Sequence, residues 1–103
     1  MIDIKRVSEI LQYRKWTEEH KFDAPSEWLV ELPKIFVKDI NETTNYFDNC
    51  TEEDISIYTE LFEDIAAKSQ SKEFVKFIEK LEGKYPNIDM KADIYWAKNA
   101  LED

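Results

Sequence analysis

An all-α fold is the class that this sequence predicts, and three observations support the prediction. Of the 103 residues 43% are hydrophobic and 14% aromatic, so a single domain over residues 1–103 has ample material for a core. One glycine and three prolines are too few turn-forming residues for the tight hairpins of an all-β fold. Apolar residues recur at helical spacing along most of the chain. We expect about five helices, mostly antiparallel, in one compact bundle.

The first two helices are expected over residues 2–20 and 26–40, where apolar residues recur at helical spacing. Pro25 marks the break between them, because the residue before a proline is pushed away from the α-helical region. Pro33 lies inside the second helix, where proline removes a hydrogen bond and clashes with the preceding turn. The second helix is therefore either kinked or split at Pro33.

Residues 41–49 are polar at both ends and are expected to form the longest loop. The helix after it, over residues 51–67, begins at Thr51, whose side chain can cap the first turn. One face of this helix is apolar and predicts contact with the core. The opposite face is an acidic strip with one aliphatic residue, at i, i+4, i+7 and i+11: Glu53, Ile57, Glu60 and Asp64. Two more helices are expected over residues 71–83, beginning at Ser71, and 90–101.

The net charge of −9 is concentrated in the middle of the chain. Residues 22–67 contain twelve acidic residues against Lys34 and Lys38, whereas residues 1–21 carry +1 and residues 68–103 carry 0. Such a field repels a phosphate backbone and attracts a basic protein. We therefore expect a basic protein partner and no direct contact with nucleic acid.

Chemistry-bearing residues are few. One cysteine and one histidine cannot supply a structural zinc set, and the only glycine has no calcium-binding loop around it. No catalytic or phosphate-binding motif is present, so we expect no enzyme activity, no cofactor and no metal. His20 is expected to be solvated and Cys50 to pack at the start of the following helix. No apolar run is long enough to span a membrane, and the unpaired cysteine fits a cytoplasmic location.

The remaining feature is an acidic surface with aromatic residues beside it. The loop over residues 41–49 and the acidic strip can form one continuous patch, in which aromatic and aliphatic side chains are anchors ringed by acids. Alternatively, the strip is a solvated face and the aromatic side chains of the loop turn into the core. On the first alternative the partner-binding residues are Tyr46, Phe47, Asp48, Glu53, Ile57, Glu60 and Asp64.

Small size, acidity, helix content and the acidic run with Tyr46, Phe47 and Tyr58 nearby give the chain a resemblance in type to bacterial immunity proteins. The resemblance implies one tight complex with a cationic toxin domain, such as a nuclease, that is blocked by charge and shape. A different class of function is also open. In that alternative, the chain is a self-associating or regulatory helical module whose acids keep it in solution, and either a monomer or a homodimer is compatible with the sequence.

Overall fold

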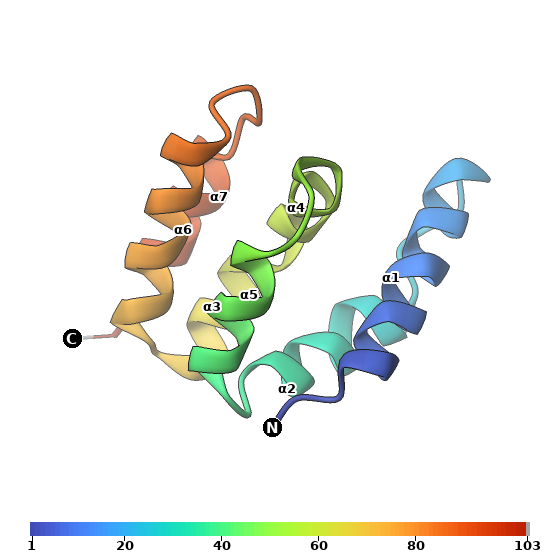
Figure 1. Ribbon diagram of the computed structural model, residues 1–103, viewed down its shortest axis with the longest axis horizontal. Helices are drawn as coiled ribbons and strands as arrows, with labels where there is room; N and C mark the ends of the chain where they lie inside the picture. Colours follow the sequence, from blue (N-terminus) through green and yellow to red (C-terminus); the bar gives the residue numbers. More distant parts are fainter. Residues whose placement is uncertain (103) are drawn as a thin grey trace.

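The computed structural model describes residues 1–102 and consists of helices joined by short loops (Figure 1). In chain order the elements are α1 (Ile4–Glu19), the π-helical turn η1 (Glu27–Glu31), α2 (Leu32–Phe36), α3 (Ile40–Asp48), α4 (Glu52–Tyr58), the 3-10 turn η2 (Thr59–Leu61), α5 (Phe62–Ser69), α6 (Lys72–Lys84) and α7 (Lys91–Asn99). No strand occurs in residues 1–102, and the predicted all-α fold is confirmed. Within this described part, every helix is too short or too polar to cross a bilayer.

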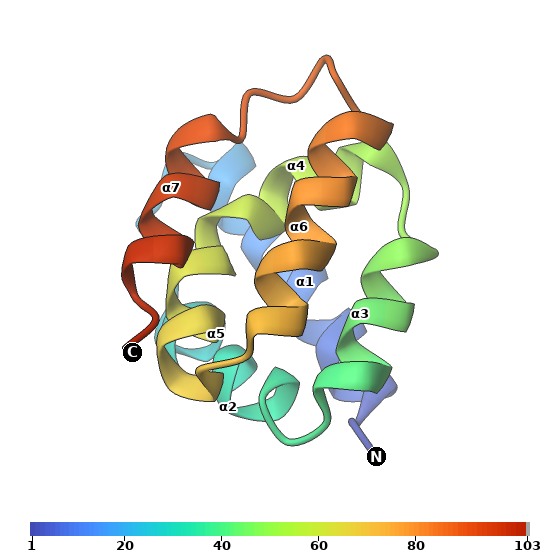
Figure 2. The ribbon, with the colours of Figure 1, turned by 90° about the vertical axis from the view of Figure 1, so that its left-hand side faces the viewer.

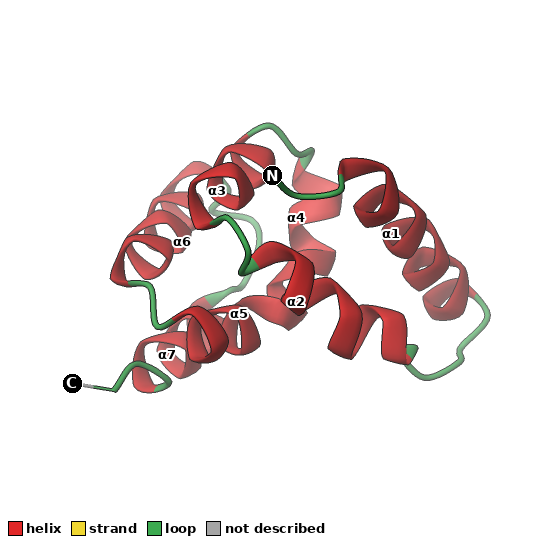
Figure 3. Ribbon diagram, turned by 90° about the horizontal axis from the view of Figure 1, so that it is seen from below, coloured by secondary structure: helices red, strands yellow, loops and turns green. Residues whose placement is uncertain are grey.

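The helices are arranged around α5, which contacts α2, α6 and α7. Helix α6 also contacts α3, and it runs antiparallel to α7, to which the loop at the top of Figure 2 joins it. Helix α1 lies at the opposite side of the molecule from α6 and α7, where it contacts η1 and α2 (Figures 1 and 3). One side of the molecule is therefore formed by α1, whose outer face has no neighbouring helix within residues 1–102.

The centre of the fold is an aromatic core. Phe47 illustrates its packing, since its ring lies 5.0 Å from the rings of both Phe36 and Tyr58. Tilted and edge-to-face pairs of this kind add to the stabilisation that apolar burial provides. These contacts join α2, α3 and α4 to one another. The largest side chains with no solvent exposure are Trp28, Phe36, Phe47, Tyr58, Phe62 and Phe74.

The segment over residues 41–49 is helical, so the prediction of a long loop there is wrong. Asp39 caps α3 by accepting a hydrogen bond from the amide of Glu42 at 3.0 Å. Thr43 is buried and donates a 2.6 Å hydrogen bond to the carbonyl of Phe36, which fixes the inner face of the helix. Although the segment is polar at both ends, it forms a short amphipathic helix whose inner positions are Thr43 and Phe47.

The predicted helix over residues 51–67 exists, but the 3-10 turn η2 interrupts it. Its start agrees with the prediction, because the Thr51 side chain accepts a hydrogen bond from the amide of Asp54. Ser56 and Thr59 donate their hydroxyl hydrogens to carbonyls three residues earlier, at 2.6 and 2.9 Å. Such side-chain bonds compete with the regular backbone pattern and bend helices. The acidic strip is consequently divided between α4, η2 and α5.

Pro33 is accommodated by the wide turn that precedes it. The amide of Leu32 bonds to the carbonyl of Glu27, five residues earlier, and α2 then begins with Pro33 in its first turn. A proline ring clashes with the carbonyl four residues before it in a regular helix, and a π-turn opens the backbone at that point. The chain therefore turns continuously through residues 27–36.

Candidate protein-binding surface

The structure places the two predicted aromatic anchors toward the core. Phe47 has 0% exposure, so its prediction as a partner-binding anchor is wrong. The periodicity of α3 explains the error, because a helix turns residue 47 to the same side as Thr43. Tyr46 is half-buried at the edge of the core, and its hydroxyl lies 2.8 Å from that of Tyr58. Burial raises the pKa of Tyr46 to about 12.

Three of the predicted acidic contacts are paired with cations of this chain. Asp48 lies 3.4 Å from the Lys84 ammonium, and Asp64 lies 2.9 Å from that of Lys68, one turn further along the same helix. Glu60 accepts two hydrogen bonds from Arg14, at 3.1 Å from Nε and 3.0 Å from Nη2. The bond to Glu60 also raises the pKa of Arg14, which remains charged. These carboxylates therefore stabilise the fold in addition to carrying charge.

Helix α1 is attached to the acidic middle of the chain by these ion pairs. Lys15 lies 2.7 Å from Asp54 and 3.9 Å from Glu53, both on α4, and its hydrogen bond to Asp54 raises its pKa. Arg14, which is 9% exposed, reaches Glu60 in η2 as described above. The cations of residues 1–21 thus neutralise part of the acidic surplus of residues 22–67. Within the predicted acidic strip, Glu60 and Glu53 lie 3.0 and 3.9 Å from cations of α1, whereas Asp64 is paired within α5.

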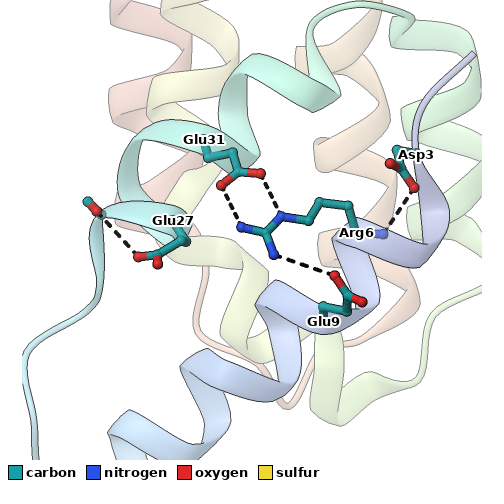
Figure 4. A network of polar contacts seen from close by, with 6 residues as sticks. Asp3, Arg6, Glu9, Glu27 and Glu31 are labelled. Carbon is teal, nitrogen blue, oxygen red and sulfur yellow. Dashed lines mark hydrogen bonds and ion pairs between the residues drawn. The ribbon is translucent and has the colours of Figure 1, made fainter.

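A second attachment of α1 lies near its other end (Figure 4). Arg6 donates two hydrogen bonds to Glu31 of η1, from Nε at 2.6 Å and from Nη2 at 2.8 Å, and a longer one to Glu9 at 3.4 Å. The Arg6 pair holds the pKa of Glu31 below its usual value. Asp3 caps the first turn of α1 at the amide of Arg6. Two bidentate arginine–carboxylate pairs therefore fix the register of α1 on its neighbours.

A groove between α1 and α4 remains open to solvent. It has a volume of about 380 Å3 and is lined by Lys15, Glu18, Glu19, Glu53 and Ile57. Ile57 is half-buried, and the Glu53 side chain is 78% exposed, so both predicted residues are accessible there. The ammonium of Lys15 is already bound by Asp54. The groove therefore offers the aliphatic side chain of Ile57, bordered by the three carboxylates of Glu18, Glu19 and Glu53 against the one cation of Lys15.

Besides Lys15, the groove contains Glu18 and Glu19, which were not among the predicted partner-binding residues. Their spacing of i+3 and i+4 from Lys15 places all three on neighbouring positions of α1. That spacing can be seen in the sequence. The net charge of +1 over residues 1–21 gives no sign of these two acids, because the cations of the same segment offset them. Of the seven predicted contacts, the structure brings Glu53 and Ile57 into this groove and leaves the others on separate surfaces or in the core.

The two reactive side chains occupy different settings. Burial raises the pKa of the Cys50 thiol to about 11, and the thiol donates a hydrogen bond to the carbonyl of Tyr46 at 3.3 Å. His20 is exposed, and its Nδ1 lies 2.8 Å from the carbonyl of Trp16. Within residues 1–102, no group of three or more histidine, cysteine, aspartate or glutamate side chains is placed to hold a metal ion.

Comparison of the chain with protein-family models, with curated proteins and with solved structures finds no match.

Proposed function

We propose that this chain binds and inhibits a basic protein domain, in the way that the immunity proteins it resembles neutralise nuclease toxins. The observation that carries the proposal is the groove between α1 and α4, where Ile57 lies among the carboxylates of Glu18, Glu19 and Glu53. Protein interfaces combine an apolar centre with a polar rim, and this groove has both. The chain acts in this proposal by covering its partner, in the cytoplasm, and not by catalysis.

Charge supports a cationic partner. The net charge is −9, and some of its carboxylates are not paired with cations of α1. The negative field of these carboxylates accelerates encounter with a basic protein. Exposed charges are screened over a distance of about 8–10 Å at ordinary ionic strength. Association with the partner is therefore expected to become slower as salt is added, while the dissociation rate depends mainly on the closely packed contacts.

The test combines capture with charge removal in the groove. The wild-type chain is used to retain a partner from a lysate of the source organism, and the retained protein is identified and purified. Its activity and its affinity are then measured with Glu18→Gln, Glu19→Gln and Glu53→Gln combined. We expect the wild type to inhibit the partner and the triple variant to bind at least about tenfold more weakly.

The matched control removes the same number of charges on the opposite side of the molecule. Glu73→Gln, Glu82→Gln and Glu102→Gln lie in α6 and after α7, away from α1. This control keeps the net charge equal to that of the groove variant, so a loss shared by both would reflect the general field alone. Capture of nothing, together with a dimer mass by light scattering at micromolar concentration, contradicts the proposal and favours a self-associating module.

A further inference from the structure

Four aromatic side chains form an exposed stack at the carboxyl end of α1. The Trp16 ring lies 4.4 Å from the His20 ring, 5.5 Å from the Phe22 ring and 6.3 Å from the Tyr13 ring, all at interplanar angles below 30°. We call these four residues the aromatic ladder. Tyr13, Trp16 and Phe22 are 44%, 47% and 58% exposed.

Local backbone geometry holds the ladder in place. Lys21 adopts a left-handed conformation with a φ of 62°, and the amides of Lys21 and Phe22 bond to the carbonyls of Glu18 and Thr17 at 3.2 and 2.8 Å. This pattern is a Schellman helix ending, in which the second residue after the cap packs against the last turn. Phe22 accordingly packs on Trp16. The ladder is therefore arranged before any partner binds.

The helix ending accounts for the contact between Trp16 and Phe22, but not for the whole ladder. Tyr13 lies one turn earlier, on the outer face of α1, and is not part of the hydrophobic core. An aromatic side chain has about 150–250 Å2 to bury, so three of them at about half exposure present roughly 300 Å2 of aromatic surface. A patch of that size on a monomer is often functional.

A second copy of this chain fits the ladder poorly. Two ladders in contact would bury about 600 Å2 in total, which is below the roughly 1,200 Å2 of a stable interface. Glu19 and Asp23 adjoin ladder residues in the sequence and form no ion pair within residues 1–102, and Lys21 is the one cation beside them that is also unpaired there. The carboxylates exceed this cation by one, so two copies would also bring a surplus of like charge together. The same two carboxylates favour a cationic occupant.

We propose that the aromatic ladder is the anchor for an arginine- or lysine-containing segment of a partner protein, with ring faces stacking on the cations and Glu19 and Asp23 pairing with them. Guanidinium and ammonium groups are attracted to aromatic faces, and the attraction is largest for tryptophan. Trp16 and Glu19 are three residues apart and so are neighbours on the helix surface, which joins the ladder to the groove described above. This inference rests on the proposed function and specifies where the basic partner is held.

The test uses a synthetic peptide of repeated Gly-Arg-Gly units and its Gly-Glu-Gly counterpart. The chain has three tryptophans, so an amide NMR spectrum contains three indole N–H resonances, which single Trp→Phe variants assign. We expect the arginine peptide to shift the Trp16 indole and the amides of residues 13–23. Trp28 is buried and Trp96 lies on α7, so their indole resonances are expected to stay unchanged, and the glutamate peptide to have no effect.

Tryptophan variants separate the ladder from non-specific attraction, because they leave the net charge unchanged. Trp16→Ala is expected to weaken the arginine peptide about tenfold or more. Trp16→Leu keeps an apolar contact for Phe22 and replaces the alanine variant if that variant unfolds. The same loss of affinity for the arginine peptide is expected. Trp96→Ala is the matched control, since Trp96 is 53% exposed on the other side of the molecule, and unchanged affinity is expected.

Several outcomes overturn the inference. Absence of peptide binding, shifts scattered over the acidic surface, or equal affinity of the wild type and both Trp16 variants would each show that the ladder does not hold cations. A wild-type dimer that Trp16→Ala converts to a monomer would show that the ladder joins two copies instead. The groove triple variant is measured on the captured partner, so the proposed function is judged independently of the peptide result.

Discussion

Replacing Glu60 by glutamine is expected to destabilise the fold. Glu60 accepts two hydrogen bonds from Arg14, whose side chain is 11% exposed while that of Glu60 is 42% exposed. Glutamine keeps the shape of the side chain but offers one acceptor oxygen and no charge. The guanidinium of Arg14 then stays largely buried, with one N–H group lacking its acceptor and with only the more distant charge of Glu18 to balance it.

The size of the effect follows from this partial burial. Hydrogen bonds to charged groups contribute about 1.5–3 kcal/mol, whereas exposed ion pairs contribute about 0–1 kcal/mol. Arg14 resembles the first case and Glu60 lies between the two, so we expect a loss of about 1–2 kcal/mol in the free energy of unfolding. For a domain of this length, that loss lowers the midpoint of thermal unfolding by roughly 5–15 °C.

Urea unfolding followed by circular dichroism measures the loss directly. The control is Asp64→Asn, because Asp64 pairs with Lys68 one turn away on the solvent-facing side of α5, and such i,i+4 pairs contribute about 0.3–0.5 kcal/mol. A double-mutant cycle with Arg14→Met isolates the coupling between Arg14 and Glu60. If Glu60→Gln lowers the free energy of unfolding no more than Asp64→Asn does, then the pair between Arg14 and Glu60 does not fix α1.

Three further predictions concern backbone, thiol and phenol. Lys21→Gly should stabilise the fold by about 0.5–1 kcal/mol in urea unfolding, because glycine adopts a positive φ without strain. Gln70 also has a positive φ, but Gln70→Gly should destabilise the fold, because the Gln70 side chain bonds to two carbonyls and one amide. Cys50 should alkylate at pH 8 about a hundredfold more slowly than in urea, because its pKa rises from 9.0 to about 11. Stability should fall as pH rises from about 9 to 12, because the fold retains the protons of Cys50, Tyr46 and Tyr58 after the unfolded chain has begun to lose them, and Tyr46→Phe should make this fall less steep.

Local signals predicted much of the helical fold. The side chains of Thr51 and Ser71 cap the helices that they were expected to begin, and the apolar spacing placed the core face of α6 correctly. In α1 the same spacing also includes Ile4 and Trp16, which are 44% and 47% exposed. Residues 41–49 were misassigned because their helix has only two inward positions and its cap, Asp39, lies outside the segment. Short elements of this kind carry too few residues for periodicity to be decisive.

The surface was harder to predict than the fold, because it depends on which helices are neighbours. The acidic strip was derived from the period of one helix, which contains no information about what covers it. Arg14 and Glu60 are 46 residues apart, and their contact arises only when α1 packs beside η2. The burial of Phe47 has a similar origin, since the packing of α3 against α2 and α4 determines it.

Helix α1 carries most of the residues on which the proposed binding depends. Its inner face carries Arg14 and Lys15, which consume part of the acidic surplus of the central segment in fixing the helix. Its border with α4 carries Glu18 and Glu19, which restore negative charge beside Ile57. Its outer face carries the aromatic ladder, next to those carboxylates. One helix thus supplies cations for folding together with the carboxylates and aromatic rings to which we assign binding. If that proposal holds, the charge that a partner meets is the charge left after α1 has packed, and the net charge of the acidic segment alone overstates it.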